Sequence, residues 1–314
     1  PANPVLLGTQ STPNTFSHNV WLDDTGDHLF TTDEVSGAFV GAYDVSDPGD
    51  ILFQDKLQSD PGSGTIPHNT YWLNDFLVTS YYTYGVTVYD ATYPHNLVET
   101  AHFDTYPGSG DGFNGAWGVY PFAPSGNLFV SDINTGLWIL APDYVHACWL
   151  EGNVTNSITS APVNAATITV LGPSLTATTG LDGHFATGTA TAVIYDVLFE
   201  AVGYFPQTIT GVLLQNGVLT IQDAALVPMV PFNYGGQVVN AGDGTGVPGA
   251  FVSLAGTDTT YTTQANASGN FTFTNIFAGT YTATAGQWGW ITDCSFSGNI
   301  DPLSPPLVIT LNEG

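Results

Sequence analysis

The sequence has almost no basic residues. Its 314 residues include 27 acidic side chains but a single Lys or Arg, Lys56, which gives a formal net charge of −26. Nucleic acids and anionic lipid surfaces are bound by clustered Lys and Arg. The composition therefore excludes nucleic acid as a partner and argues against recognition of anionic lipid.

Long apolar runs and cysteine are also scarce. No run approaches the ~20 apolar residues of a membrane-spanning helix, so we expect no membrane insertion. The two cysteines are Cys148 and Cys294. An even cysteine count in a secreted chain favours a disulfide, so this pair is the disulfide candidate, with free buried thiols or an intermolecular bridge as the alternatives.

Charge of either sign is sparse, because charged residues make up only 9% of the chain. A hydrophobic content of 43% with 13% aromatic residues indicates a folded protein. The polar surface must then consist mainly of Thr, Ser, Asn, Gly and Tyr, with almost no site for trypsin-like proteases. This composition suits a secreted or cell-surface protein, and we expect an extracellular location.

A pattern of short apolar strands separated by Gly and Asp or Asn turns recurs about every 47 to 50 residues before residue 147. The copies are clearest at residues 18–48, 68–94 and 116–140. A repeat of this length is typical of propeller blades. We therefore predict an all-β chain whose residues 1–147 form a partial β-propeller of about three blades.

Three blades do not close a ring, since propellers use about four to eight. The end blades would leave apolar faces that need a cover. We expect that cover to come from the remaining blades of a larger precursor or from copies of the same chain. The first residues align with positions inside later repeats, so both ends of the sequence are expected to be cuts through such a precursor.

A second period, of about 86 residues, begins after residue 147. Gly152 is echoed by Gly236, and the turn at Asp182-Gly183 is echoed by Ser268-Gly269. The short runs between such turns alternate apolar and polar residues, which indicates antiparallel sandwiches. The prediction is two β-sandwich modules, at residues 148–230 and 231–314, with no helix.

These residues resemble known families. The first part is similar to the LVIVD-repeat propeller of the choice-of-anchor B family, through Ser17-His-Asn-Val, Tyr43-Asp-Val-Ser-Asp-Pro, Ile66-Pro-His-Asn and Phe113-Asn-Gly-Ala-Trp-Gly. Both later units resemble carboxypeptidase-regulatory-like modules with a transthyretin-like sandwich. The second unit departs from that pattern at Ser268-Gly269 and at Gly289-Trp290. The resemblance implies a secreted bacterial or surface protein with further modules or an anchoring signal.

Motifs for nucleophilic, metallopeptidase or phosphate chemistry are absent from the sequence. We therefore predict that the chain is not an enzyme. A larger secreted hydrolase, with its active residues on blades outside this sequence, is an alternative.

The pairs His18-Asn19 and His68-Asn69 occupy equivalent positions in consecutive copies, just before an apolar strand. Strands at these positions would line a common channel, so the two imidazoles are expected to converge. Neutral histidine is the commonest metal ligand, which makes the four residues metal or ligand candidates. The simpler interpretation is that the histidines cap the strand by hydrogen bonds. The third copy has Gly115-Ala116 instead.

Three carboxylates, Asp23, Asp24 and Asp27, crowd one turn. Oxygen ligands of this kind suit calcium, so they are calcium candidates, although their spacing matches no known calcium loop. A plain solvated turn is the simpler interpretation, since Asp and Gly are common turn residues. No other cofactor is expected.

Aromatic residues gather at 81–84 and 288–290. We expect Tyr81 to be buried, and Tyr82, Tyr84, Trp288 and Trp290 to be exposed surface-binding aromatics. Such rings stack on sugars or dock a protein partner. Together these features predict a non-catalytic structural or adhesive protein in a surface or secreted assembly such as a filament, with a polysaccharide-binding or surface-ligand-binding module as the alternative.

Overall fold

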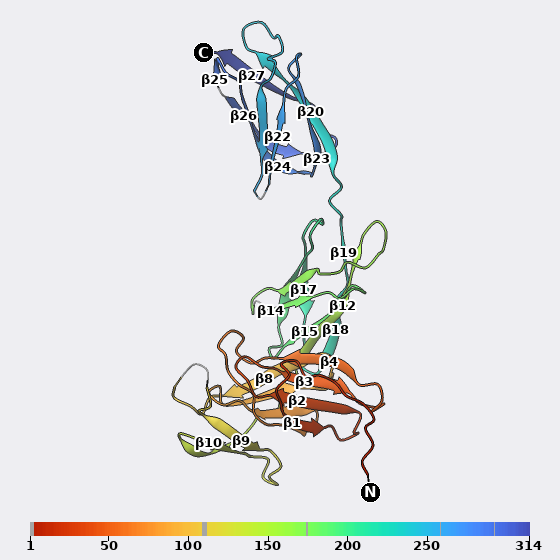
Figure 1. Cartoon of the computed structure of the whole chain (residues 1–314), viewed down its shortest axis with the longest axis vertical. Coiled ribbons are helices and arrows are strands. Elements are labelled where there is room, and N and C mark those ends of the chain that lie inside the picture. The colour runs from red at the N-terminus through yellow and green to blue at the C-terminus, as the bar shows by residue number, and fades with distance from the viewer. Residues whose placement is uncertain (1–2, 109–111, 174, 258, 292) are drawn as a thin grey trace. The chain divides into compact units, whose positions relative to one another are not determined.

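Strands form all the regular structure that we observe. The computed structural model describes residues 3–108, 112–173, 175–257, 259–291 and 293–314, and the side chains of 293–295 lie outside the description. Within these ranges there are 27 strands and no helix (Figure 1). Consequently, the described residues contain no helix long and apolar enough to cross a membrane. The predicted all-β class is confirmed.

The first eleven strands form three antiparallel sheets in which each strand pairs with the next along the chain. Sheet 1 contains β1 (Ser17–Leu22), β2 (His28–Asp33), β3 (Val40–Asp44) and β4 (Leu52–Leu57). Sheet 2 contains β5 (Thr70–Leu73), β6 (Phe76–Ser80), β7 (Val86–Asp90) and β8 (Val98–Phe103). Sheet 3 contains β9 (Ala116–Tyr120), β10 (Leu128–Asp132) and β11 (Gly136–Leu140).

Sheet 2 lies between the other two sheets, because its strands are apolar on both faces. One face packs Leu77 and Tyr89 against Phe30 and Ala42 of sheet 1. All four are fully buried. The Phe30 ring also stacks on Trp72, with 5.5 Å between ring centroids and 12° between the planes. This layer is the core between sheets 1 and 2.

The opposite face of sheet 2 packs on sheet 3. Val78 and Val86 contact Val119, Leu128 and Val130, all of them at most 5% exposed. In β10 the buried residues alternate with outward ones, as a strand covered on one face requires. Together the three sheets form a stack with two outer faces.

The outer faces of the stack are rich in exposed apolar side chains. On sheet 3, Leu137 and Ile139 of the edge strand β11 are 69% and 58% exposed. The register pairs Ile139 with Phe129, and Phe129 with Tyr120, so these three side chains lie on the same face of sheet 3. On sheet 1, Val20 and other apolar residues of β1 and β4 are about half exposed. None of the sheets among the described residues closes into a ring.

Two sheets form the first sandwich. One holds β12 (Cys148–Asn156), β15 (His184–Thr189), β18 (Val218–Ile221) and β19 (Ala224–Leu226). The other holds β13 (Thr167–Val170), β14 (Leu175–Thr178), β16 (Ile194–Glu200) and β17 (Gln207–Leu213). Phe185 and Phe199, one from each sheet, are buried and meet edge to face at 5.8 Å.

Two sheets also form the second sandwich. One holds β20 (Phe232–Asn240), β23 (Asn270–Ile276), β25 (Trp290–Ile291) and β27 (Leu307–Glu313). The other holds β21 (Phe251–Ala255), β22 (Thr260–Gln264), β24 (Gly279–Gly286) and β26 (Asp293–Ile300). Their shared core includes Val238, Ile309, Val252 and Leu254, all fully buried.

The two sandwiches repeat one topology. The order β15-β12-β18 matches β23-β20-β27, and β14-β13-β16-β17 matches β22-β21-β24-β26. In each sandwich the first strand pairs in parallel with the last one or two strands. Gly183 and Gly269 both have positive φ, 79° and 76°, where the turn between strands requires it. This agreement follows from the 86-residue repeat of the sequence.

Internal contacts divide the chain into two compact units, residues 1–202 with 206–226 and residues 203–205 with 227–314. The first unit holds both the stack and the first sandwich. There the Trp149 indole donates to the carbonyl of Asn96, which precedes β8. The Asn96 amide donates to the carboxylate of Glu151 at 3.0 Å. The three domains predicted from the sequence, at residues 1–147, 148–230 and 231–314, stay a prediction.

Candidate metal centre

The structure brings His18 and His68 together. His18 lies in β1, and His68 lies two residues before β5. Their rings stack with centroids 4.4 Å apart and planes 27° apart. β1 and β5 are the first strands of adjacent sheets in the stack, so equivalent residues lie side by side. The imidazoles converge, as the sequence predicts.

Glu34 completes the cluster, directly after β2. Its Oε2 lies 3.0 Å from Nδ1 of His18, and its Oε1 lies 3.7 Å from Nε2 of His68. One potential ligand atom from each of the three residues lies within 4.8 Å of the other two. In the described part of the chain, this is the only group of three or more His, Cys, Asp or Glu residues whose ligand atoms lie this close together. Two imidazoles and a carboxylate can hold a metal ion or share a proton.

Neighbouring groups fix the two less exposed members of the cluster, His68 and Glu34. The carbonyl oxygen of Trp117, in β9, accepts a hydrogen bond from Nδ1 of His68. The Tyr82 hydroxyl donates to Oε1 of Glu34 at 2.6 Å. His68 is only 3% exposed. Burial lowers the pKa of His68, while the Trp117 carbonyl partly offsets that effect.

The two asparagine candidates have different surroundings. The Asn19 Oδ1 accepts a hydrogen bond from the backbone N–H of Thr70 at 3.1 Å, which links β1 to β5. The Asn69 Nδ2 atom lies 2.9 Å from Nδ1 of His68, on the side away from Glu34. Asn19 therefore joins two sheets, and Asn69 contacts the ring of a cluster member.

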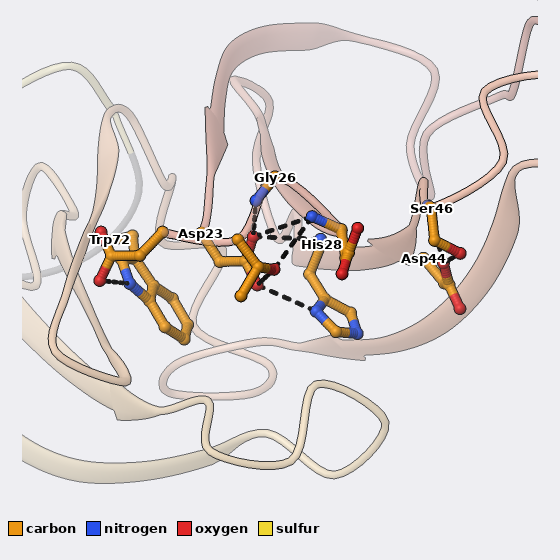
Figure 2. A network of polar contacts seen from close by, with 9 residues as sticks. Asp23, Gly26, His28, Asp44, Ser46 and Trp72 are labelled. Carbon is orange, nitrogen blue, oxygen red and sulfur yellow. Dashed lines mark hydrogen bonds and ion pairs between the residues drawn. The ribbon is translucent and has the colours of Figure 1, made fainter.

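Asp23 organises the turn where the sequence suggests calcium. Its Oδ1 accepts from the backbone N–H groups of Gly26, Asp27 and His28, and its Oδ2 lies 3.0 Å from Nδ1 of His28 (Figure 2). Burial is the largest single effect and by itself would raise the pKa of Asp23, but its hydrogen-bond donors together outweigh burial and lower the pKa. The oxygens of Asp23 thus already have protein donors.

Asp24 is likewise engaged, because its Oδ2 accepts from the Trp72 indole at 3.1 Å (Figure 2). This bond joins the β1–β2 turn to sheet 2. The contacts of Asp23 and Asp24 match the turn interpretation of the three carboxylates. A calcium ion at Asp23, Asp24 and Asp27 would have to displace these donors.

The aromatic residues are only partly as expected. Tyr81 is fully buried, but Tyr82 is 3% exposed rather than open to solvent. The exposure expected for Tyr82 is wrong because its backbone pairs with Ala116 and its hydroxyl reaches Glu34. Tyr84 is half-buried and stacks on His102 with 4.0 Å between centroids.

In the second sandwich the two tryptophans differ. Trp288 is 97% exposed, whereas Trp290 is half-buried and packs against the core. Trp290 therefore has a packing role, and Trp288 alone of the pair is fully available for a partner.

The disulfide candidates lie in different units. Cys148 is buried, and burial raises the pKa of its thiol. The side chain of Cys294 lies outside the described residues. Pairing of these cysteines stays a prediction.

Sequence reasoning missed three groups of the cluster. Glu34 is not among the residues singled out from the sequence, although it directly follows β2 and lies beside His18. Tyr82 was assigned to the surface. The Trp117 carbonyl is a backbone group, and only the pairing of sheets reveals it.

Residues 235–292, in the second sandwich, match the carboxypeptidase regulatory-like domain family. This agrees with the resemblance drawn from the motifs of that unit. The match to a non-catalytic regulatory-like domain points to a non-enzymatic protein, in line with the prediction from the sequence. The comparison with curated proteins found no match.

Among solved structures the chain is similar to a streptococcal ancillary pilin, at 9% identity and a TM-score of 0.42, covering 95% of this chain and 99% of that one. It is also similar to a minor pilin of Streptococcus agalactiae, at 13% identity and a TM-score of 0.38, covering 53% and 96%. A third is the TIE protein of Bacillus anthracis, at 13% identity and a TM-score of 0.26, covering 94% and 56%.

The resemblance to the LVIVD-repeat propeller of the choice-of-anchor B family is wrong. The matching family is the carboxypeptidase regulatory-like domain, and the sheets at residues 17–140 are open rather than closed into a ring. The physical reason is that short strands alternating with Gly and Asp turns are shared by every meandering antiparallel sheet. The period predicts the strands correctly but does not specify the family, and the partial propeller stays a prediction.

Proposed function

We propose that the chain is a non-catalytic, extracellular structural or adhesive subunit that associates with copies of itself. The observation that carries the proposal is the apolar outer face of sheet 3, formed by Leu137 and Ile139 beside Phe129 and Tyr120. Contiguous exposed apolar surface marks interaction sites on soluble proteins. A second such face lies on sheet 1.

The partner is a second copy because the stack itself supplies two apolar faces of the same kind. Both faces of sheet 2 are covered by other sheets of the same chain, sheet 1 on one side and sheet 3 on the other. An outer face of one copy can therefore be covered in the same way by an outer face of another. Contacts between unlike faces do not close and would extend into a filament.

The charge of the chain supports an extracellular site of action. A net charge of −26 with one basic residue opposes nonspecific binding to nucleic acid and to anionic membranes. It also makes copies repel one another at low ionic strength, so association driven by the apolar faces should strengthen as salt screens this repulsion.

Sedimentation velocity over a range of protein and salt concentrations tests the proposal. We expect species heavier than the 33.1 kDa monomer, increasing with both protein and salt. The double variant Leu137→Ser, Ile139→Ser should shift the distribution toward monomer. Leu181→Ser is the matched control, since Leu181 is 85% exposed but belongs to the first sandwich.

Either of two results would refute the proposal. One is a wild-type chain that stays monomeric at every concentration. The other is a double variant that associates as strongly as wild type while retaining its far-ultraviolet circular dichroism spectrum.

A further inference from the structure

We propose that His18, Glu34 and His68 bind one divalent transition-metal ion, of which zinc is the best fit. The site lies at one edge of the stack, where sheet 1 supplies His18 and Glu34 and the segment before β5 supplies His68. It is separate from the apolar outer faces, so the inference does not depend on the proposed assembly.

The spacing of the ligand atoms suits a small ion. Zinc binds imidazole nitrogen and carboxylate oxygen at ~2.0–2.2 Å, so two of its tetrahedral ligands lie roughly 3.3 Å apart. The Glu34 oxygens lie 3.0 Å and 3.7 Å from the nearest nitrogens of His18 and His68. Small side-chain adjustments would therefore place all three ligands around one ion.

The chemistry of the donors selects the class of metal. Two imidazoles and one carboxylate are typical ligands of zinc and related transition metals. Calcium prefers six to eight oxygen ligands, and this cluster has a single carboxylate. The side chain of His18 is 34% exposed, so a fourth position can be taken by water.

Hydrogen bonds from neighbouring groups orient two of the proposed ligands, His68 and Glu34, as is usual in metal centres. Histidines that bind a metal usually donate their other ring N–H to a carbonyl or carboxylate. A carbonyl oxygen only accepts, so the bond to Trp117 places a hydrogen on Nδ1 of His68. The Asn69 side-chain amide, which also lies beside Nδ1, then presents its oxygen to that atom in place of its nitrogen. In the neutral ring the lone pair of Nε2 then faces the carboxylate of Glu34.

Glu34 is held in the same manner. The Tyr82 hydroxyl donates to its Oε1 at 2.6 Å and orients the carboxylate. Without an ion between them, a nitrogen lone pair and a carboxylate oxygen would repel each other. A cation at this point removes that repulsion and ties the sheets together.

The test is titration of the chelator-treated full chain with Zn²⁺ by calorimetry, together with Co²⁺ and visible absorption spectroscopy. We expect one ion per chain, Co²⁺ bands that report bound nitrogen ligands, and a higher melting temperature with Zn²⁺ by mass action. Ca²⁺ should neither compete nor raise the melting temperature.

Two variants with a matched control locate the site. His18→Gln and Glu34→Gln should each weaken Zn²⁺ binding by at least ~10-fold. The control is His28→Gln, because His28 also lies 3.0 Å from a carboxylate with a side chain 32% exposed, but has no second histidine. It should leave the affinity within about twofold. Circular dichroism verifies that each variant is folded.

Tyr82→Phe removes only the hydroxyl that orients Glu34, and it should weaken binding by a smaller factor than Glu34→Gln does. The proposal is overturned if the folded wild-type chain takes up no Zn²⁺ or Co²⁺. It is equally overturned if His28→Gln weakens binding as much as His18→Gln, or if Ca²⁺ displaces Zn²⁺.

Discussion

Replacing Asp55 with Asn should stabilise the protein at neutral pH. Asp55, in β4, accepts a hydrogen bond from the backbone N–H of Leu97 at 2.8 Å, across the boundary between sheets 1 and 2. Burial raises the pKa of Asp55 to about 6, although this hydrogen bond, Lys56 and His95 act in the opposite direction. The ionised form is therefore disfavoured in the folded state.

The sign follows from proton linkage. An unfolded Asp has a pKa of ~3.9, so between about pH 4 and pH 6 the folded state binds more protons than the unfolded state. The free energy of unfolding then falls as the pH rises through this window. A pKa difference of about two at ~1.4 kcal/mol each gives roughly 3 kcal/mol, which solvent at a partly exposed carboxylate reduces to about 1–2 kcal/mol.

Urea unfolding followed by circular dichroism at several pH values measures the effect. Asp55→Asn keeps an oxygen for Leu97 but cannot ionise, so it should exceed wild type by about 1–2 kcal/mol at pH ~7 and equal it at pH ~4. Equal stabilities at neutral pH, or a gap that widens toward acid, would refute the reasoning.

Asp44→Asn provides the control of opposite sign. The exposed Asp44 carboxylate accepts from the backbone N–H and the hydroxyl of Ser46 at 2.9 and 2.6 Å (Figure 2). These bonds lower the pKa of Asp44. Its contribution to stability is present at neutral pH and disappears as the pH falls through its folded pKa, so this variant should lose stability at neutral pH and approach wild type in acid.

Three further predictions use the same unfolding assay. Phe30→Leu should lower the free energy of unfolding by at least ~0.5–1.5 kcal/mol, because it removes the stack on Trp72. The control Phe53→Leu, at a side chain 48% exposed, should change the free energy of unfolding by at most ~0.5 kcal/mol. Equal costs for the two variants would contradict the stacking of sheets 1 and 2. Asp23→Ala should lower the free energy of unfolding by about 1–3 kcal/mol, because it leaves backbone N–H groups of the turn without their acceptor. Ca²⁺ should not alter the stability of the wild-type chain. If Ca²⁺ raised the melting temperature of the wild type but not of Asp23→Ala, the calcium interpretation would be restored. Trp288→Ala should be neutral within ~0.5 kcal/mol, since the ring is 97% exposed; a larger loss would mean that the ring is covered.

Local pattern was enough to predict the strands. In β10 the alternation around Val130 indicates a strand covered on one face, and the paired turns at Gly183 and Gly269 indicate repeated modules. Alternation does not encode how sheets meet, however. The resemblance to the LVIVD-repeat propeller family failed for that reason, since different arrangements of sheets use the same strands and turns.

The candidate site shows a similar division. The equivalence of His18 and His68 in successive repeats was sufficient to predict that they converge. The burial of Tyr82 was not predictable from its neighbours, because it depends on pairing with Ala116, which is far away in the sequence. The role of Trp117 depends on a backbone carbonyl, which carries no side-chain signal.

The parallel pairing of the first and last strands in the second sandwich has a mechanical consequence. β20 and β27 run side by side in the same direction over five residue pairs. A force that pulls the start of β20 away from the end of β27 therefore slides the strands along each other and loads all of their hydrogen bonds together. Antiparallel hairpin ends pulled apart would release theirs one at a time. The first sandwich pairs β12 with β18 and β19 in the same sense, so each module is built to resist tension along the chain.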